Sequence, residues 1–379
     1  MNKVVKLTTI IAFSIMSISQ AQNYSWNNNP GSLPSGIKHA TYKSTAMNVD
    51  IGYNIFLPSD YNSSNERYPV IYALHGMGGN ENEGPEPYSK VLQSGINSKA
   101  FPPVIVVFVN GRGNTFYSDS KDGSVKCETT ISKELIAHID ATYRTKADRT
   151  QRAIEGFSMG GFGALLHGFK HTEQYTSIST YDAALVTWDT ISQQQFDQSI
   201  PRQIFGSDKQ YFTDNCYPFT FAKKNVETIK SLGIKVKMVT GSNDLQMGPL
   251  YYYNLAMRDT LTKLGMAPEF KIIQGGSHGS GRNETTIRES IIFHTNNFKT
   301  TGVINRQPLS YASMSVYKPR IVSSMSTFTV PSAWKGTVSA ISVSDLKGRN
   351  IGLVEINDIN SFRIPSSVSN EKLLISPVR

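Results

Sequence analysis

The chain has 379 residues, of which 39% are hydrophobic and 18% charged, with 29 glycines, 17 prolines and 2 cysteines. This globular composition excludes a disordered chain, a collagen-like chain and a small disulfide-stapled scaffold, and the length predicts roughly two or three domains. The net charge is +9, of which +2 lies in the first 21 residues and +5 after position 300. The middle of the chain carries only the remaining +2, so we expect no nucleic-acid partner.

The first 21 residues have the pattern of a secretory signal peptide. Lys3 and Lys6 precede a 12-residue apolar stretch from Leu7 to Ile18, and Ser19-Gln20-Ala21 offers small residues for cleavage before Gln22. The apolar stretch is too short to span a bilayer. A buried N-terminal helix is the alternative, but neither a cap nor a helical period supports it. We therefore expect a secreted or cell-surface protein without a membrane span.

Export also bears on the two cysteines, Cys127 and Cys216. An oxidising compartment permits a disulfide between them, and this bridge is the expectation that we favour. Their spacing in the sequence specifies nothing by itself, so two unpaired buried thiols are the alternative.

Between about positions 50 and 300, short apolar runs alternate with longer segments of helical period. The expected strands are 48–57, 70–74, 104–109, 153–154, 177–180, 235–239 and 270–273. The expected helices are 128–143, 159–170, 217–232, 251–264 and 286–298. Such alternation is typical of a mostly parallel sheet covered by helices. The pattern predicts a doubly wound α/β domain over residues 22–300.

The composition changes after about residue 300, where Ser, Thr and Val dominate and prolines separate short β-prone runs. Val338–Leu353 alternates apolar and polar residues around a turn at Asp345–Gly348, which predicts a β-hairpin. Residues 301–379 are thus expected to form a separate, small all-β domain.

Gly156-Phe157-Ser158-Met159-Gly160 matches the pattern G-x-S-x-G, which is weak evidence alone. Its context is more specific, because a predicted strand leads into it and a predicted helix follows. A serine in such a strand-turn-helix stands exposed at the carboxyl end of a sheet, and the flanking glycines allow the strand and the helix to approach. Ser158 is therefore the candidate nucleophile.

A serine nucleophile in this setting needs an acid and then a histidine further along the chain. Asp244 follows the predicted strand 235–239, and His278 follows the predicted strand 270–273. Both would lie at the edge of the sheet that carries Ser158. His278 would take the serine proton, and Asp244 would orient the imidazole. The alternatives are a simple turn residue for Asp244 and a solvated loop residue for His278.

Three other residues compete for these roles. Asp182 also follows a strand, although one that comes early for the acid, and His294 lies inside a helical pattern. His75 precedes Ser158 and opens a glycine-rich loop directly after an apolar strand. That loop is better explained as a source of backbone N–H donors for an oxyanion.

An oxyanion hole for Ser158 needs two such donors. The N–H of Met159 lies at the first turn of the predicted helix, where backbone N–H groups have no helical partner. We expect the second donor to be the N–H of Met77 or Gly76, in the loop after His75.

The stretches Tyr68–Gly76, Glu134–Arg144 and Glu155–Gly161 resemble the putative-esterase branch of the α/β-hydrolases. This branch contains feruloyl and acetylxylan esterases of the first carbohydrate-esterase family, S-formylglutathione hydrolases and mycolyltransferases. The resemblance covers about residues 45–298 and implies ester hydrolysis through an acyl-serine, without a metal or an organic cofactor. The chain departs from the family after His278, where Gly279-Ser280-Gly281 stands in place of an aromatic residue.

The C-terminal segments Ile341–Arg349 and Lys372–Ile375 resemble the sorting domains of the type IX secretion route. This resemblance implies the secretion machinery as a partner. The glycine and the aromatic residue that usually precede the last strand are absent, and Ser369-Asn370-Glu371 stands there. A small β-sandwich that binds a surface or a glycan is therefore the alternative for this domain.

Export and the resemblance together predict a serine esterase that removes feruloyl or acetyl groups from plant cell-wall polysaccharide. Several aromatic residues lie near the expected active edge, and among them Trp188 is our candidate for a wall of the substrate pocket. A secreted acyltransferase or another esterase would use the same triad. A non-catalytic, surface-displayed glycan-binding protein on a hydrolase scaffold is the alternative of a different class.

Overall fold

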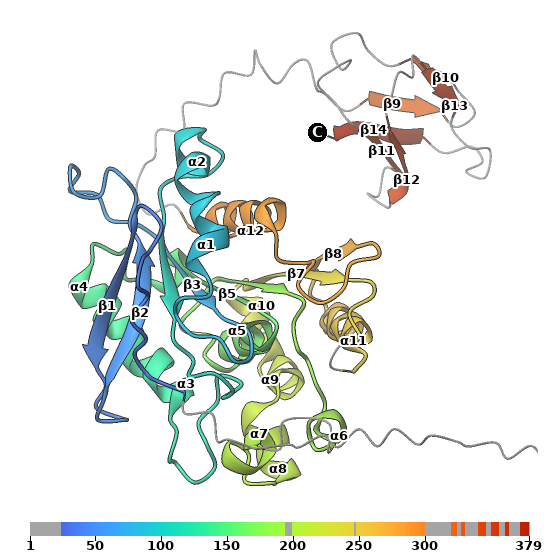
Figure 1. Cartoon of the computed structure of the whole chain (residues 1–379). Coiled ribbons are helices and arrows are strands. Elements are labelled where there is room, and N and C mark those ends of the chain that lie inside the picture. Colours follow the sequence, from blue (N-terminus) through green and yellow to red (C-terminus); the bar gives the residue numbers. More distant parts are fainter. Residues whose placement is uncertain are drawn as a thin grey trace, which may run out of the picture. The chain divides into compact units, whose positions relative to one another are not determined.

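The computed structural model describes residues 24–193, 199–245 and 248–299, together with short strands between residues 320 and 378 (Figure 1). The predicted signal peptide, residues 1–21, lies outside the described residues. The chain divides into two compact units, residues 1–299 and 300–379. Within the described ranges no helix is both long and apolar enough to cross a membrane.

The first unit is built on an eight-stranded sheet with the order β1-β2-β4-β3-β5-β6-β7-β8. Its strands are β1 (Ile37–Lys43), β2 (Asp50–Phe56), β3 (Val70–Leu74), β4 (Ile105–Val109), β5 (Arg152–Phe157), β6 (Ser177–Tyr181), β7 (Lys235–Gly241) and β8 (Glu269–Ile273). The pairs β1/β2 and β2/β4 are antiparallel, and all other pairs are parallel. The predicted mostly parallel sheet is confirmed. Strand β1 was not predicted, because this edge strand is half exposed and has no continuous apolar run.

The helices of this unit vary widely in length. They are α1 (Pro85–Ser89), α2 (Leu92–Asn97), α3 (Cys127–Thr129), α4 (Ile136–Thr142), α5 (Met159–Lys170), α6 (Trp188–Ile191), α7 (Ser199–Gln203), α8 (Lys209–Tyr211), α9 (Pro218–Lys224), α10 (Val226–Ser231), α11 (Leu250–Lys263) and α12 (Glu284–Asn297). π-Helical turns span Thr130–Leu135 and Phe212–Cys216, and a 3₁₀ turn spans Arg149–Gln151. The five predicted helical regions are present, whereas α1, α2 and α6–α8 are too short to produce a readable period.

The sheet is buried on both faces, as parallel sheets usually are. In β3, Val70, Tyr72 and Leu74 face one core, and Ile71 and Ala73 face the other. Helices α5, α9, α10 and α11 pack on the first face, and α1, α2 and α12 pack on the second (Figure 1). This arrangement brings the carboxyl ends of β5, β6, β7 and β8 to one edge of the sheet.

The second unit contains only antiparallel pairs among its described strands. A four-stranded sheet has the order β12-β11-β14-β9, and β10 pairs with β13. The strands are β9 (Arg320–Ser323), β10 (Thr327–Thr329), β11 (Ala340–Asp345), β12 (Asn350–Glu355), β13 (Ser361–Arg363) and β14 (Lys372–Val378). Antiparallel pairing of β11 with β12 confirms the predicted hairpin.

The structure corrects the expectation of a disulfide between the two cysteines. Cys127 and Cys216 are both buried and both free. Each thiol has its own polar neighbour, since Cys127 Sγ lies 3.4 Å from the Gly111 carbonyl oxygen and Cys216 lies beside Ser118. Burial raises the pKa of both thiols to about 12, so both stay protonated near neutral pH.

We expect a water-soluble thiol reagent to modify neither cysteine in the native protein at pH 8, and to titrate 2 thiols after denaturation without a reductant. Protonated, buried thiols are poor nucleophiles, and denaturation exposes them. Absorbance of the released chromophore counts the thiols. Zero thiols in the denatured, unreduced protein would mean that the bridge does form.

Candidate active site

Ser158 occupies a strained turn between β5 and α5. Its backbone angles, φ 55° and ψ −117°, are sparsely populated for a residue with a side chain and cost about 1–3 kcal/mol. Hydrogen bonds hold this conformation, because the Ser158 N–H donates to the Tyr181 carbonyl at 2.9 Å and the Ser158 carbonyl accepts from the Ala184 N–H at 2.9 Å. The surrounding fold therefore fixes the serine where the predicted strand-turn-helix requires it.

The two glycines of the G-x-S-x-G pattern permit close backbone approach at this turn. A Cβ on Gly156 would lie 2.1 Å from the Gly160 carbonyl oxygen. A Cβ on Gly160 would lie 2.3 Å from the Leu74 carbonyl oxygen, at the end of β3. No side chain fits at either position, so the spacing of the pattern follows from packing.

The structure brings Ser158, His278 and Asp244 together in one chain of hydrogen bonds. His278 Nε2 lies 2.8 Å from Ser158 Oγ, and His278 Nδ1 lies 3.0 Å from each carboxylate oxygen of Asp244. Because the carboxylate can only accept at Nδ1, the neutral ring has its proton there and Nε2 is left to accept from the serine hydroxyl. Asp244 is fully buried, whereas 12% of the His278 side chain is exposed.

The loops that carry the acid and the histidine lie side by side. After β7, the Ser242 N–H donates to the Ile273 carbonyl at the end of β8, and the Asn243 N–H donates to Gly276 at 2.8 Å. A Cβ on Gly241 would lie 2.2 Å from the Gly276 carbonyl oxygen. These contacts set the distance between the Asp244 and His278 side chains.

The competing residues have other partners in the described structure. Asp182 is fully buried, and its carboxylate accepts from the N–H groups of Gly241, Gly279 and Gly281. Burial raises the pKa of Asp182. His294 is buried on α12, where its Nδ1 lies 2.7 Å from Ser177 Oγ at the start of β6.

His75 fixes the glycine-rich loop after β3. Its Nε2 accepts from the Gly111 N–H at 2.9 Å, so the proton is on Nδ1, which donates to the Gly76 carbonyl at 2.7 Å. Burial lowers the pKa of His75 and keeps the ring neutral. The side chain is therefore a structural support for the loop.

Of the two donors that we considered in this loop, only one is free. The Gly76 N–H already donates to Glu83 Oε2 at 3.1 Å, which excludes it and corrects that expectation. Within the described residues the Met77 N–H has no hydrogen-bond partner. Met159 is the first residue of α5, so its N–H also lacks a helical acceptor. Met77 and Met159 therefore remain the two candidate donors of an oxyanion hole.

A cavity of about 510 Å³ opens beside Ser158 and His278. Its lining consists of Tyr24, Gly76, Met77, Gly78, Glu83, Asn114, Phe157, Ser158 and His278. Sequence reasoning missed Tyr24, Glu83 and Asn114, because loop residues without a period give no signal of where they meet. Trp188, our candidate for a wall of the substrate pocket, is not in this lining. Trp188 packs against the core with its ring 5.8 Å from that of Phe212.

Phe157 supplies the aromatic contact to the histidine that the loop after His278 lacks. The rings of Phe157 and His278 are 5.2 Å apart. On Phe157 lies the Arg282 guanidinium, 4.2 Å from the ring centre, and Arg282 pairs with Glu83 at 2.8 Å. Phe157, the residue before the nucleophile, therefore packs against the His278 imidazole.

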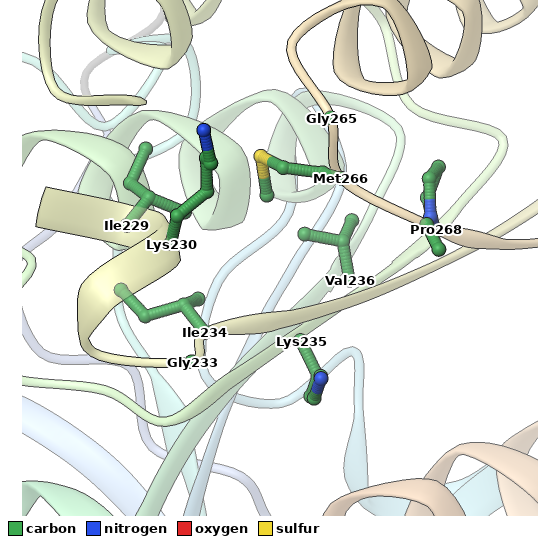
Figure 2. Close-up of a pocket in the computed structure, with 10 residues that line it drawn as sticks. Ile229, Lys230, Gly233, Ile234, Lys235, Val236, Gly265, Met266 and Pro268 are labelled. Carbon is green, nitrogen blue, oxygen red and sulfur yellow. The ribbon is translucent and has the colours of Figure 1, made fainter. Parts of the chain in front are cut away.

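A second cavity of about 330 Å³ lies at the opposite end of β7 (Figure 2). It is formed by the end of α10, the start of β7 and the turn before β8, and among its lining Lys230 and Lys235 are the charged residues. No hydroxyl, carboxylate or imidazole lines it, so it has none of the groups of a serine triad. The chemistry of the first unit is concentrated at the carboxyl edge of the sheet.

A mostly parallel sheet with a serine elbow after β5, an acid after β7 and a histidine after β8 defines an α/β-hydrolase fold. Solved structures with this fold are similar. A ferulic acid esterase has a TM-score of 0.59 at 23% identity and covers 71% of this chain and all of its own. The S-formylglutathione hydrolase of Staphylococcus aureus has a TM-score of 0.57 at 17% identity, covering 69% of this chain and 98% of its own.

The chain belongs to the esterase family whose model is described as "Putative esterase", which matches residues 44–244. An esterase of Mycobacterium tuberculosis is 34% identical over 144 residues, which are 37% of this chain and 30% of the relative. An endo-1,4-beta-xylanase/feruloyl esterase of Xylanibacter ruminicola is 33% identical over 147 residues, 37% of this chain and 20% of the relative. The match thus spans less than a third of the length of either relative.

Proposed function

We propose that the protein is an exported serine carboxylic-ester hydrolase that removes feruloyl or acetyl groups from plant cell-wall polysaccharide. The observation that carries the proposal is the hydrogen-bonded chain from Ser158 through His278 to Asp244, in a member of an esterase family.

In this proposal Ser158 Oγ attacks the ester carbonyl while His278 Nε2 takes its proton. The negative charge that develops on the carbonyl oxygen is stabilised by the N–H groups of Met159 and Met77. His278 then donates the proton to the departing alcohol, which leaves an acyl-serine. Water, deprotonated by His278, then attacks the acyl-serine, and His278 returns the proton to Ser158 Oγ as the acid is released. Asp244 stabilises the imidazolium in both halves of the reaction.

The substrate class is supported by the relatives and by the cavity. One relative is named a xylanase/feruloyl esterase, and a structural neighbour is a ferulic acid esterase. The cavity beside Ser158 offers the aromatic ring of Tyr24 and the flexible side chain of Met77 as apolar contacts for an acyl group. Export is supported by the sequence of residues 1–21, and the C-terminal unit would serve in sorting or in binding a glycan.

The experiment measures turnover of p-nitrophenyl acetate, methyl ferulate and acetylated xylan by the secreted protein. Release of ferulate or of acetate from xylan is the expected result. Ester turnover in which an added alcohol competes strongly with water would favour an acyltransferase. No turnover of any ester would overturn the proposal in favour of a non-catalytic glycan-binding protein.

Tyr24→Ala should raise the KM for methyl ferulate by roughly tenfold and leave that for p-nitrophenyl acetate nearly unchanged, since only the larger acyl group would reach the Tyr24 ring. Tyr252→Ala is the matched control, because Tyr252 is 61% exposed on α11. Trp188→Ala should leave the ratio of the two activities unchanged. If Trp188→Ala altered the ratio of the two activities and Tyr24→Ala did not, Trp188 and not Tyr24 would be the residue that contacts the acyl group.

A further inference from the structure

Asp182 lies at the junction of the two loops that carry the acid and the histidine. It follows β6 directly, is fully buried and has a φ of 46°, which is strained for a residue with a side chain. Its N–H donates to the Val239 carbonyl of β7 at 2.8 Å, which holds this conformation. A buried carboxylate on a strained backbone indicates a role for Asp182 other than reversing the direction of the chain.

The carboxylate binds backbone N–H groups of both loops. Oδ1 accepts from Gly241 at 2.7 Å, three residues before Asp244. Oδ2 accepts from Gly279 at 2.9 Å, the residue after His278, and from Gly281 at 2.7 Å. One side chain thereby links the loop of the acid to the loop of the base.

The backbone of the histidine loop is held by polar contacts, among them the hydrogen bonds to Ser242 and Asn243. Residues 275–281 include four glycines, two serines and His278, so the loop has no aliphatic side chain that could pack in the core. A Cβ on Gly281 would come within 2.8 Å of Asp182 Oδ2, which shows how closely the loop backbone lies on the carboxylate. Charge-assisted hydrogen bonds to this carboxylate are strong and directional.

We propose that Asp182 is a positioning residue, which holds the His278 imidazole between Ser158 and Asp244 by binding the backbone of the histidine loop. The inference rests on the proposed function, because it assigns Asp182 a part in the same site. Asp182 does not contact the reacting atoms. Its effect passes through Gly279 and Gly281 to the ring position, and a displacement of about 1 Å at a reacting group can cost about 10²-fold in rate.

The test compares Asp182→Asn and Gly281→Ala with the control Asp259→Asn, which changes a half-exposed aspartate on α11. In Asp182→Asn, one of the two carboxylate oxygens becomes an NH₂ donor that faces the loop N–H groups. In Gly281→Ala, the carboxylate of Asp182 remains, but the added Cβ pushes the histidine loop away from it. Turnover of p-nitrophenyl acetate is measured per active site, by titration with a fluorophosphonate. We expect kcat to fall about 10²-fold in both variants, with KM within about twofold of the wild type.

A second measurement does not depend on turnover. The Nδ1 proton shared by His278 and Asp244 gives a downfield proton NMR signal, assigned by its loss in His278→Gln. We expect this signal to shift or broaden in Asp182→Asn and Gly281→Ala, and to stay unchanged in Asp259→Asn.

If the wild type hydrolyses no ester but the signal responds as described, the proposed function fails while the positioning role stands. An unchanged signal together with wild-type kcat per active site in both variants would overturn the role of Asp182. So would a loss of activity that is explained entirely by a smaller number of titratable sites, because this would indicate a folding defect.

Discussion

Ser158→Ala should reduce ester turnover by about 10⁴- to 10⁶-fold. The substitution removes the only atom that forms the acyl intermediate, and the N–H donors and the cavity remain. Alanine carries the same Cβ, so the strained backbone and its hydrogen bonds to Tyr181 and Ala184 are retained. The measurement is kcat/KM with p-nitrophenyl acetate on protein purified away from any host esterase.

The control for this variant is its thermal unfolding, which should occur within a few degrees of the wild type because no cavity larger than one oxygen atom is created. Labelling by a fluorophosphonate should be lost at the same time. Residual turnover above about 1% of wild type, with intact folding, would show that another residue is the nucleophile.

Asp244→Asn should lower kcat by about 10⁴-fold and alter KM little. The fully buried carboxylate accepts the Nδ1 proton of His278 with both oxygens. An amide can donate its own proton to the ring, which favours the tautomer that has its proton at Nε2 and cannot accept from Ser158. Steady-state kinetics across several ester concentrations separates kcat from KM.

The comparison with Asp182→Asn makes this prediction selective. Both aspartates are buried and follow neighbouring strands, but only Asp244 contacts the imidazole. We expect the Asp244 variant to lose about 100 times more activity than the Asp182 variant. The reverse order would identify Asp182 as the catalytic acid and refute the assignment made from the hydrogen bonds.

The sheet was predictable because strands such as Val70–Leu74 and Ile105–Val109 are short apolar runs, and the long helices α11 and α12 bury one side. The expected helix 128–143 contains a π-helical turn at Thr130–Leu135. This turn retains one apolar side, so the apolar pattern of the sequence does not distinguish it from an α-helix. Short helices and the edge strand β1 depend on tertiary contacts that a local pattern does not contain.

The meeting of Ser158, Asp244 and His278 could be predicted because each follows a strand of one parallel sheet, whose carboxyl ends coincide. The lining of the cavity could not, because Tyr24, Glu83 and Asn114 come from loops far apart in the sequence. Trp188 lies outside this lining and packs against the core, because an aromatic residue near a strand end can turn either into the core or into the site. The expected disulfide failed because spacing carries no information on the distance between two thiols.

The position of β8 at the edge of the sheet has a consequence for how the protein loses activity. This strand is the last in the order, pairs only with β7 in the described sheet and has no fully buried residue. Edge strands with little apolar cover open at a lower free energy than the central strands. Since the loop after β8 carries His278, local fraying at this edge removes the base while the rest of the sheet stays folded. Catalytic competence therefore depends on this edge strand as well as on the global stability of the fold.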